Sequence, residues 1–210
     1  MTGSLLIQNF DTTRTKSDID GMVNFFDSIC QRNKSNNAPL DLKITNSLAI
    51  TLLKCFQWYG DLSDINRAID ILDEALLACP DGDTKYKNLL LNNFASSSLE
   101  RFTKLGDIAD FNNAAIAYQV AVDTSTNVNK CASITYNLGH LLLRRLHALG
   151  SIDDADRALS IFQAAMQNSP DGSAEKAESI IARSRALLHR FWHLQDSQDV
   201  NQAITLLNGT

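Results

Sequence analysis

Apolar residues recur every three to four positions along most of this sequence, which is the spacing of one face of an α-helix. One segment carries Leu48, Leu52 and Phe56, and the next carries Ile69 and Leu72. Prolines are rare and long alternating β-branched runs are absent, so the pattern predicts an all-α chain. The predicted helices span about 4–11, 18–32, 41–59, 63–79, 84–105, 108–123, 129–149, 153–168, 174–194 and 198–208.

Three kinds of residue recur in the same phase with a period of 44 to 46 residues. The first is a glycine at the end of a long apolar segment. The second is an aspartate that opens the next segment, and the third is a small or slim residue four positions later. The first series is Gly60, Gly106 and Gly150, followed by Gln195; the second is Asp18, Asp64, Asp110, Asp154 and Asp199; the third is Met22, Ala68, Ala114, Ala158 and Ala203.

Each recurring residue has a physical reason. Glycine ends a helix in the left-handed conformation at little cost. Aspartate at a helix start accepts backbone N–H bonds, and we expect the aspartate series, together with Asp61 and Asp153, to cap helices. Alanine lets the two helices of a hairpin cross closely. Because no single hairpin can bury its own apolar face, stacked hairpins are expected.

The unit from Ala132 to Asp171 resembles a tetratricopeptide (TPR) repeat. It carries Leu138-Gly139 and Leu142 in its first helix, Ala158 and Phe162 in its second, and a closing Pro170. Weaker copies begin at Leu48-Ala49 and Phe94-Ala95. The resemblance implies a right-handed solenoid of antiparallel helix hairpins, the TPR-like α-α superhelix. It divides the chain into an N-terminal partial repeat or cap, 1–40, and an array, 41–210, with units 41–82, 83–127, 128–172 and an incomplete 173–210.

The period is longer than the 34 residues of an ordinary TPR. The phrases GDLSDINRAI, GDIADFNNAA and GSIDDADRAL are similar to long-period arrays of filamentous and mushroom-forming fungi. Those arrays often stand beside caspase-like CHAT peptidase domains or in NLR-type immune proteins. This likeness gives an alternative function: a regulatory or substrate-recruiting fragment of such a larger protein.

Composition narrows the classes of partner. The net charge of −5 argues against nucleic acid and an anionic membrane. The chain has no apolar run of the roughly 18 residues that span a bilayer, and its first residues do not look like a signal peptide. The four cysteines lie in or beside apolar helical patterns, which favours structural thiols in a reducing, cytoplasmic location. These are Cys30, Cys55, Cys79 and Cys131.

No motif in the sequence predicts chemistry. His189 and His193 stand four residues apart, a spacing that can chelate zinc, but no Glu or Cys completes the set. Neither phosphate-binding glycine motif is present, and no segment around a cysteine resembles a caspase-like active site. We therefore expect no catalytic residue, no metal and no cofactor, and a protein that is not an enzyme.

The remaining prediction is a binding surface. In TPR arrays the first helix of each unit lines the concave face, so the resemblance implies a partner-binding row that is mostly polar. This row is Asn46, Ile50, Lys54, Asn92, Ser96, Glu100, Tyr136, His140, Arg144, Ile181, Arg185 and His189. The predicted function is a protein–protein interaction scaffold that binds a peptide, helix or domain. A merely solvated face is the alternative interpretation, and self-association through open solenoid ends is a further one.

Basic residues concentrate in the last two first helices, although the chain is acidic overall. They are Arg144, Arg145, Arg183, Arg185 and Arg190. The arginine fork suits carboxylates, so an acidic partner is predicted across these two units. The competing interpretation is that the arginines pair internally with Glu100, Asp153 or Glu178.

Overall fold

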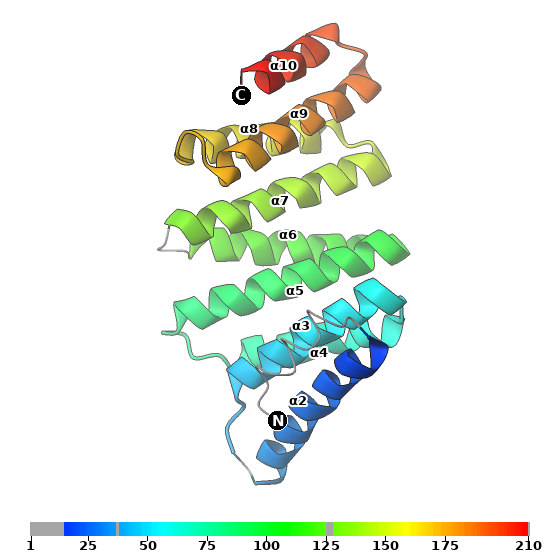
Figure 1. The fold of residues 1–210 in the computed structure, drawn as a ribbon, viewed down its shortest axis with the longest axis vertical. Helices are drawn as coiled ribbons and strands as arrows, with labels where there is room; N and C mark the ends of the chain where they lie inside the picture. The colour runs from blue at the N-terminus through cyan, green and yellow to red at the C-terminus, as the bar shows by residue number, and fades with distance from the viewer. Residues whose placement is uncertain (1–14, 37, 125–127, 210) are drawn as a thin grey trace. The chain divides into compact units, whose positions relative to one another are not determined.

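The computed structural model describes residues 15–36, 38–124 and 128–209, with side chains at all of these except 128–133. The regular secondary-structure elements in this part of the chain are all α-helices (Figure 1). The helices are α2 (Lys16–Ser35), α3 (Leu42–Tyr59), α4 (Leu62–Ala78), α5 (Thr84–Leu105), α6 (Ile108–Asp123), α7 (Val128–Leu149), α8 (Ile152–Asn168), α9 (Ala174–Leu194) and α10 (Ser197–Asn208). The predicted all-α, solenoid-like class is confirmed. The short helix predicted at about 4–11 lies outside the described residues.

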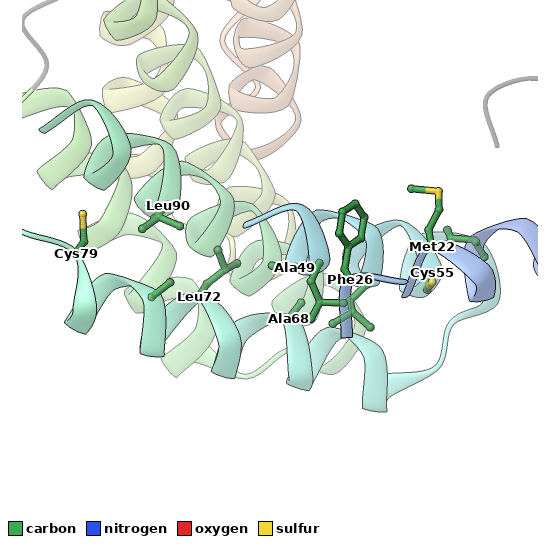
Figure 2. Packing of buried hydrophobic residues seen from close by; sticks show 12 residues of the cluster. Met22, Phe26, Ala49, Cys55, Ala68, Leu72, Cys79 and Leu90 are labelled. Atoms are coloured by element: carbon green, nitrogen blue, oxygen red, sulfur yellow. The ribbon is translucent and has the colours of Figure 1, made fainter. Parts of the chain in front are cut away.

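The chain divides into two compact units, Met1–Arg101 and Phe102–Thr210. In the first unit α3 and α4 form a hairpin, and α2 packs on α3. Its core joins side chains of α2, α3, α4 and α5, and Figure 2 shows Phe26, Ala49, Leu72 and Leu90 among them. In the second unit α7 packs on α8, α8 on α9 and α9 on α10, with α6 against α7. The boundary falls inside the predicted repeat 83–127.

Each hairpin turn uses two residues. The first adopts the left-handed conformation, with φ of 74° at Gly60, 73° at Gly106, 71° at Gly150 and 56° at Gln195. The second caps the next helix, as when Asp61 accepts a hydrogen bond from the backbone nitrogen of Ser63 at 2.9 Å. The predicted glycine series is therefore a series of left-handed turn residues. Gln195 holds the same conformation without glycine's freedom.

The predicted capping role was wrong for most of the aspartate series. The cap is the residue three positions earlier, which is Asp61, Asp107 or Asp196 in three of the four turns. The series members Asp110, Asp154 and Asp199 lie one turn inside the helix and are at most 2% exposed. A buried carboxylate at this depth needs a partner other than the helix end.

That partner is an arginine in two repeats. Arg145 donates from Nε to Asp154 at 2.5 Å and from Nη2 to the other carboxylate oxygen. Arg190 does the same with Asp199, at 3.0 Å and 2.5 Å. In each pair the arginine stands nine residues before the aspartate, at the end of the preceding helix. Each hairpin is thus tied across its turn by a bidentate ion pair.

The first hairpin lacks this ion pair. Nine residues before Asp64 stands Cys55, whose thiol cannot replace a guanidinium. The carboxylate of Asp64 makes no hydrogen bond or ion pair with the described residues around it. Burial, followed by the nearby charges of Asp61 and Asp20, raises the pKa of Asp64 above its ordinary value. The same register position is therefore a stabilised ion pair in one hairpin and an unpaired carboxylate in another.

Close contact between hairpin helices is sharpest at Gly139 of α7. A Cβ added there would lie 2.7 Å and 2.8 Å from the ring of Phe162 on α8. The same position holds Ala49, Ala95 and Ser184 in the other repeats, and these are at most 3% exposed. The small residue of the predicted TPR-like pair is therefore explained by the approach of the second helix.

We expect Gly139→Ala to lower the free energy of unfolding by about 1–3 kcal/mol, because the buried Phe162 ring must shift. The matched control is Gly21→Ala in α2, where an added Cβ meets nothing within 4 Å. There alanine should stabilise by roughly 0.5–1 kcal/mol through helix propensity alone. Urea unfolding of both variants measures the two signs. Equal stabilisation would show that the α7–α8 contact is loose.

Candidate partner-binding site

Three rings lie together on one side of the second unit. Tyr136 and His140, one turn apart on α7, have ring centroids 4.5 Å apart. Both rings meet Phe162 of α8 edge-on, at 5.7 Å and 5.4 Å. Phe162 is fully buried, whereas the other two are half-buried. The apolar core thus fixes the orientation of two polar rings at its edge.

Two arginines flank these rings. Arg144 on α7 is exposed, and its Nη1 donates to the hydroxyl of Thr103 at 2.7 Å. Arg185 on α9 is also exposed. Burial, then the charges of Arg185 and Arg144, lowers the pKa of His140. The histidine is therefore neutral at neutral pH, between two permanent positive charges.

A second pair of rings continues the row. His147 of α7 and His189 of α9 meet edge-on, with centroids 5.7 Å apart. Burial, followed by His147, Arg185 and His193, lowers the pKa of His189. The prediction omitted His147, although it stands one heptad after His140 and so shares its helix face.

Together these residues form what we call the basic face of α7 and α9. It comprises Tyr136, His140, Arg144, His147, Ile181, Arg185 and His189. Ile181 adds an apolar element that is 52% exposed. Glu178 lies close enough to raise the pKa of Tyr136, after burial. The basic face thus has one carboxylate at its edge, that of Glu178, against two arginines and three histidines.

The corresponding row in the first unit differs. Asn46 is only 7% exposed, and its side-chain oxygen accepts a hydrogen bond from Asn93 at 2.7 Å. It is a packing residue, so its assignment to an open groove was wrong. Glu100 accepts a weak hydrogen bond from Gln57 at 3.4 Å. The other four predicted residues are half-buried: Ile50, Lys54, Asn92 and Ser96.

The predicted basic cluster is divided by the structure. Arg145 and Arg190 serve the hairpin ion pairs described above, and Arg190 also binds Asp156 at 2.5 Å. The expected internal partners Glu100, Asp153 and Glu178 are not the ones these arginines use. Arg144 and Arg185 remain on the basic face. Arg183 points elsewhere and is considered separately below.

The chemistry-bearing residues show no assembled reactive centre in the part of the chain described. No three His, Cys, Asp or Glu residues there are grouped to hold a metal ion. Burial raises the pKa of the Cys30 and Cys79 thiols and raises that of Cys55 to about 12. These thiols are therefore protonated and poor nucleophiles at neutral pH. Among the described helices, none has the length and apolar character needed to cross a bilayer.

Comparison with solved structures finds chains whose fold is similar to this one. The chain is similar to the crystal structure of BtubC (BKLC) from P. vanneervenii, with 17% identity and a TM-score of 0.57, over 99% of this chain and 77% of that one. A de novo designed helical repeat protein, DHR64, matches over 98% of this chain and 93% of its own, with 12% identity and a TM-score of 0.36. No family model matches the chain. No curated protein matches it in sequence. At this identity the first likeness supports the fold alone.

Proposed function

We propose that this chain is a protein-interaction module with no chemistry of its own, and that its basic face binds an acidic segment of a partner protein. The observation that carries the proposal is the pair Arg144 and Arg185, both exposed beside the half-buried His140. Arginine presents a planar donor fork that binds carboxylates bidentately. The chain's overall charge is −5, so general attraction to anions does not explain this local excess.

The repeats are proposed to be of TPR type, with a long period. Support comes from the small residue at Gly139 packed against Phe162, where the TPR-like pattern also places a small and an aromatic residue. A module of this type uses side chains of its first helices to hold an extended or helical partner. The basic face is built from two such helices, α7 and α9.

The proposed partner segment combines carboxylates with apolar side chains. Carboxylates would pair with the two arginines, and an apolar residue would cover Ile181, which is 52% exposed. Tyr136 and His140 would offer hydrogen bonds from rings already oriented by Phe162. An amphipathic helix with glutamates one turn apart supplies this combination.

A labelled Glu-, Ala- and Leu-containing helical peptide, measured by fluorescence anisotropy, tests the proposal. Arg144→Gln with Arg185→Gln should weaken binding by about tenfold or more, because charge-assisted hydrogen bonds contribute roughly 1.5–3 kcal/mol each. The control variant, Arg32→Gln with Arg157→Gln, removes the same charge from exposed positions on α2 and α8. Equal binding by wild type and the Arg144/Arg185 variant would overturn the proposal. So would equal binding of a peptide with Gln in place of Glu.

Binding to the basic face should strengthen as the pH falls from about 7 to about 5.5. The lowered pKa values of His140 and His189 mean that both rings are neutral at the upper end. A bound carboxylate favours their charged form, so protonation and binding reinforce each other. Without peptide, a falling pH has the opposite effect on the protein. The unfolded chain binds more protons than the folded chain below about pH 6.5, so the free energy of unfolding falls as the pH falls. Anisotropy and thermal melting across this range separate the two effects.

A further inference from the structure

A pocket in the second unit lies between α8, α9 and α10. Its volume is about 320 Å³. Leu159 and Gln163 of α8, Arg183 and Leu187 of α9, and Gln202 of α10 contribute to its lining. Residues two apart on a helix do not share a face, so Arg183 is directed away from the row of Arg185. This pocket is therefore separate from the basic face.

Arg183 is the unexplained residue of this pocket. Its Nε is buried and has no hydrogen-bond acceptor. No described residue forms an ion pair with it, and burial alone lowers its pKa without a compensating acid. An arginine does not lose its charge at physiological pH, so it remains a cation with an unsatisfied donor. A donor that is buried without a partner destabilises the fold.

The fold does not require an arginine at this position. In the same register the other repeats hold Leu48, Phe94 and Leu138, and the two leucines are 2% and 5% exposed. A leucine would therefore suit the local packing. The one carboxylate lining the pocket, Asp156, is already bound by Arg190. The pocket thus contains a guanidinium whose counter-charge is not supplied by the neighbouring side chains.

We propose that this pocket binds a carboxylate carried on a short aliphatic chain, with Arg183 as its counter-ion. The guanidinium would donate to the carboxylate, and Gln163 and Gln202 could donate from their side-chain amides. Leu159 and Leu187 would contact the methylene groups. Both a free small carboxylate and a glutamate side chain of a partner have this chemistry. The site is independent of the proposed acidic segment on the basic face.

The test follows the Nε–Hε signal of Arg183 by NMR, assigned by its loss in Arg183→Leu. The wild-type chain is titrated at constant ionic strength with acetate and with acetyl-glutamate amide. Acetyl-glutamine amide, which has the same shape without the charge, is the control ligand. We expect the Arg183 signal to shift and saturate with a carboxylate, and neighbouring amide signals to stop responding in Arg183→Leu. Arg185→Gln should leave this titration unchanged.

Each outcome decides the proposal. Saturation with acetate as well as acetyl-glutamate amide supports a site for free small carboxylates. Saturation with acetyl-glutamate amide alone supports a partner's acidic side chain. No shift with either, or an equal shift with acetyl-glutamine amide, overturns the site. Arg183→Leu introduces the residue that two other repeats have at this position, so its melting temperature should equal or exceed that of wild type. The titration of the wild-type chain can be interpreted whether or not this variant folds.

Discussion

Asp154→Asn is expected to lower the free energy of unfolding by about 3–5 kcal/mol, because it breaks a buried ion pair by neutralising one partner. Asp154 is fully buried and holds Arg145 by two hydrogen bonds. The asparagine keeps the shape but leaves the guanidinium without its counter-charge. That guanidinium also lies 4.2 Å from the centre of the Phe111 ring, so α6 and the α7–α8 hairpin share the loss.

The matched control is Asp64→Asn, at the same register of the first hairpin. Asp64 forms no ion pair with an arginine, and burial, Asp61 and Asp20 raise its pKa against the opposing charges of Arg67 and Lys16. When the pKa of a carboxyl group is higher in the folded state than in the unfolded state, the free energy of unfolding falls as the pH rises through the folded pKa. Neutralising it relieves this effect but removes a favourable helix-dipole charge of roughly 0.3–1 kcal/mol. The net change at neutral pH should therefore stay within about 1 kcal/mol.

Urea unfolding at neutral pH compares the two variants. A large loss for both would mean that Asp64 has a partner in solution that substitutes for the missing arginine. A small loss for both would show that the Arg145–Asp154 pair is exchangeable with a neutral hydrogen bond. Only a large loss at Asp154 with a small change at Asp64 agrees with the ion pair as the stabilising feature.

The helices and turns were predictable because their causes are local. Apolar spacing along the chain sets the helix face, and a left-handed residue ends the helix wherever Gly60 or its equivalents stand. The small residue at Gly139 was likewise visible as part of a repeated pattern. In each case the residues that determine the structure lie within one or two turns of one another.

The role of the aspartate series was not predictable in the same way. Asp61 and Asp64 both stand at the start of α4, and an aspartate at either position could cap the helix. Only the structure shows which of the two accepts the backbone hydrogen bonds. The arginine that pairs with the aspartate lies nine residues upstream, on another helix. Cys55 stands at that position in the first hairpin, and nothing in the sequence next to Asp64 indicates that the arginine is missing. Sequence alone could not separate a cap from a buried ion pair.

The place of Asn46 in the binding row was predicted with the same kind of error. Carrying the row over from a TPR-like pattern assumes that every unit presents the same open face. In the first unit Asn93 reaches Asn46 and closes that contact. In the second unit aromatic and basic side chains take the equivalent positions, and Arg185 and Arg144 stay exposed. The side chains of the neighbouring helix decide whether a residue of the binding row is exposed. The sequence of the row itself does not contain that information.

Leu72→Ala is expected to lower the free energy of unfolding by about 2–5 kcal/mol, whereas Leu207→Ala should cost less than about 1 kcal/mol. The two leucines occupy the same register of α4 and α10, three repeat periods apart. Leu72 is fully buried, and Leu207 is 48% exposed. The positions between them, Tyr118 and Phe162, are at most 1% exposed, so burial is the rule for this register.

The difference arises from what packs on the second helix of each repeat. In the second unit α9 packs on α8 and covers that register, as it covers Leu159, which is 8% exposed. Ile204 is the equivalent of Leu159 on α10 and is 52% exposed. Removing methyl groups from a surface that water already reaches leaves no cavity, so the cavity part of the loss disappears.

Urea unfolding of both leucine variants, repeated at two protein concentrations, measures the contrast. A loss at Leu207 as large as that at Leu72 would mean that the face of α10 is buried in solution. Urea midpoints that rise with protein concentration would then identify a second copy of the chain as the covering surface, because association stabilises by mass action. A small loss at Leu207, with a urea midpoint that does not depend on protein concentration, would instead show that this face of α10 is exposed to solvent. The fully buried Leu72 and the half-exposed Leu207 would then differ in cost because only one of them leaves a cavity.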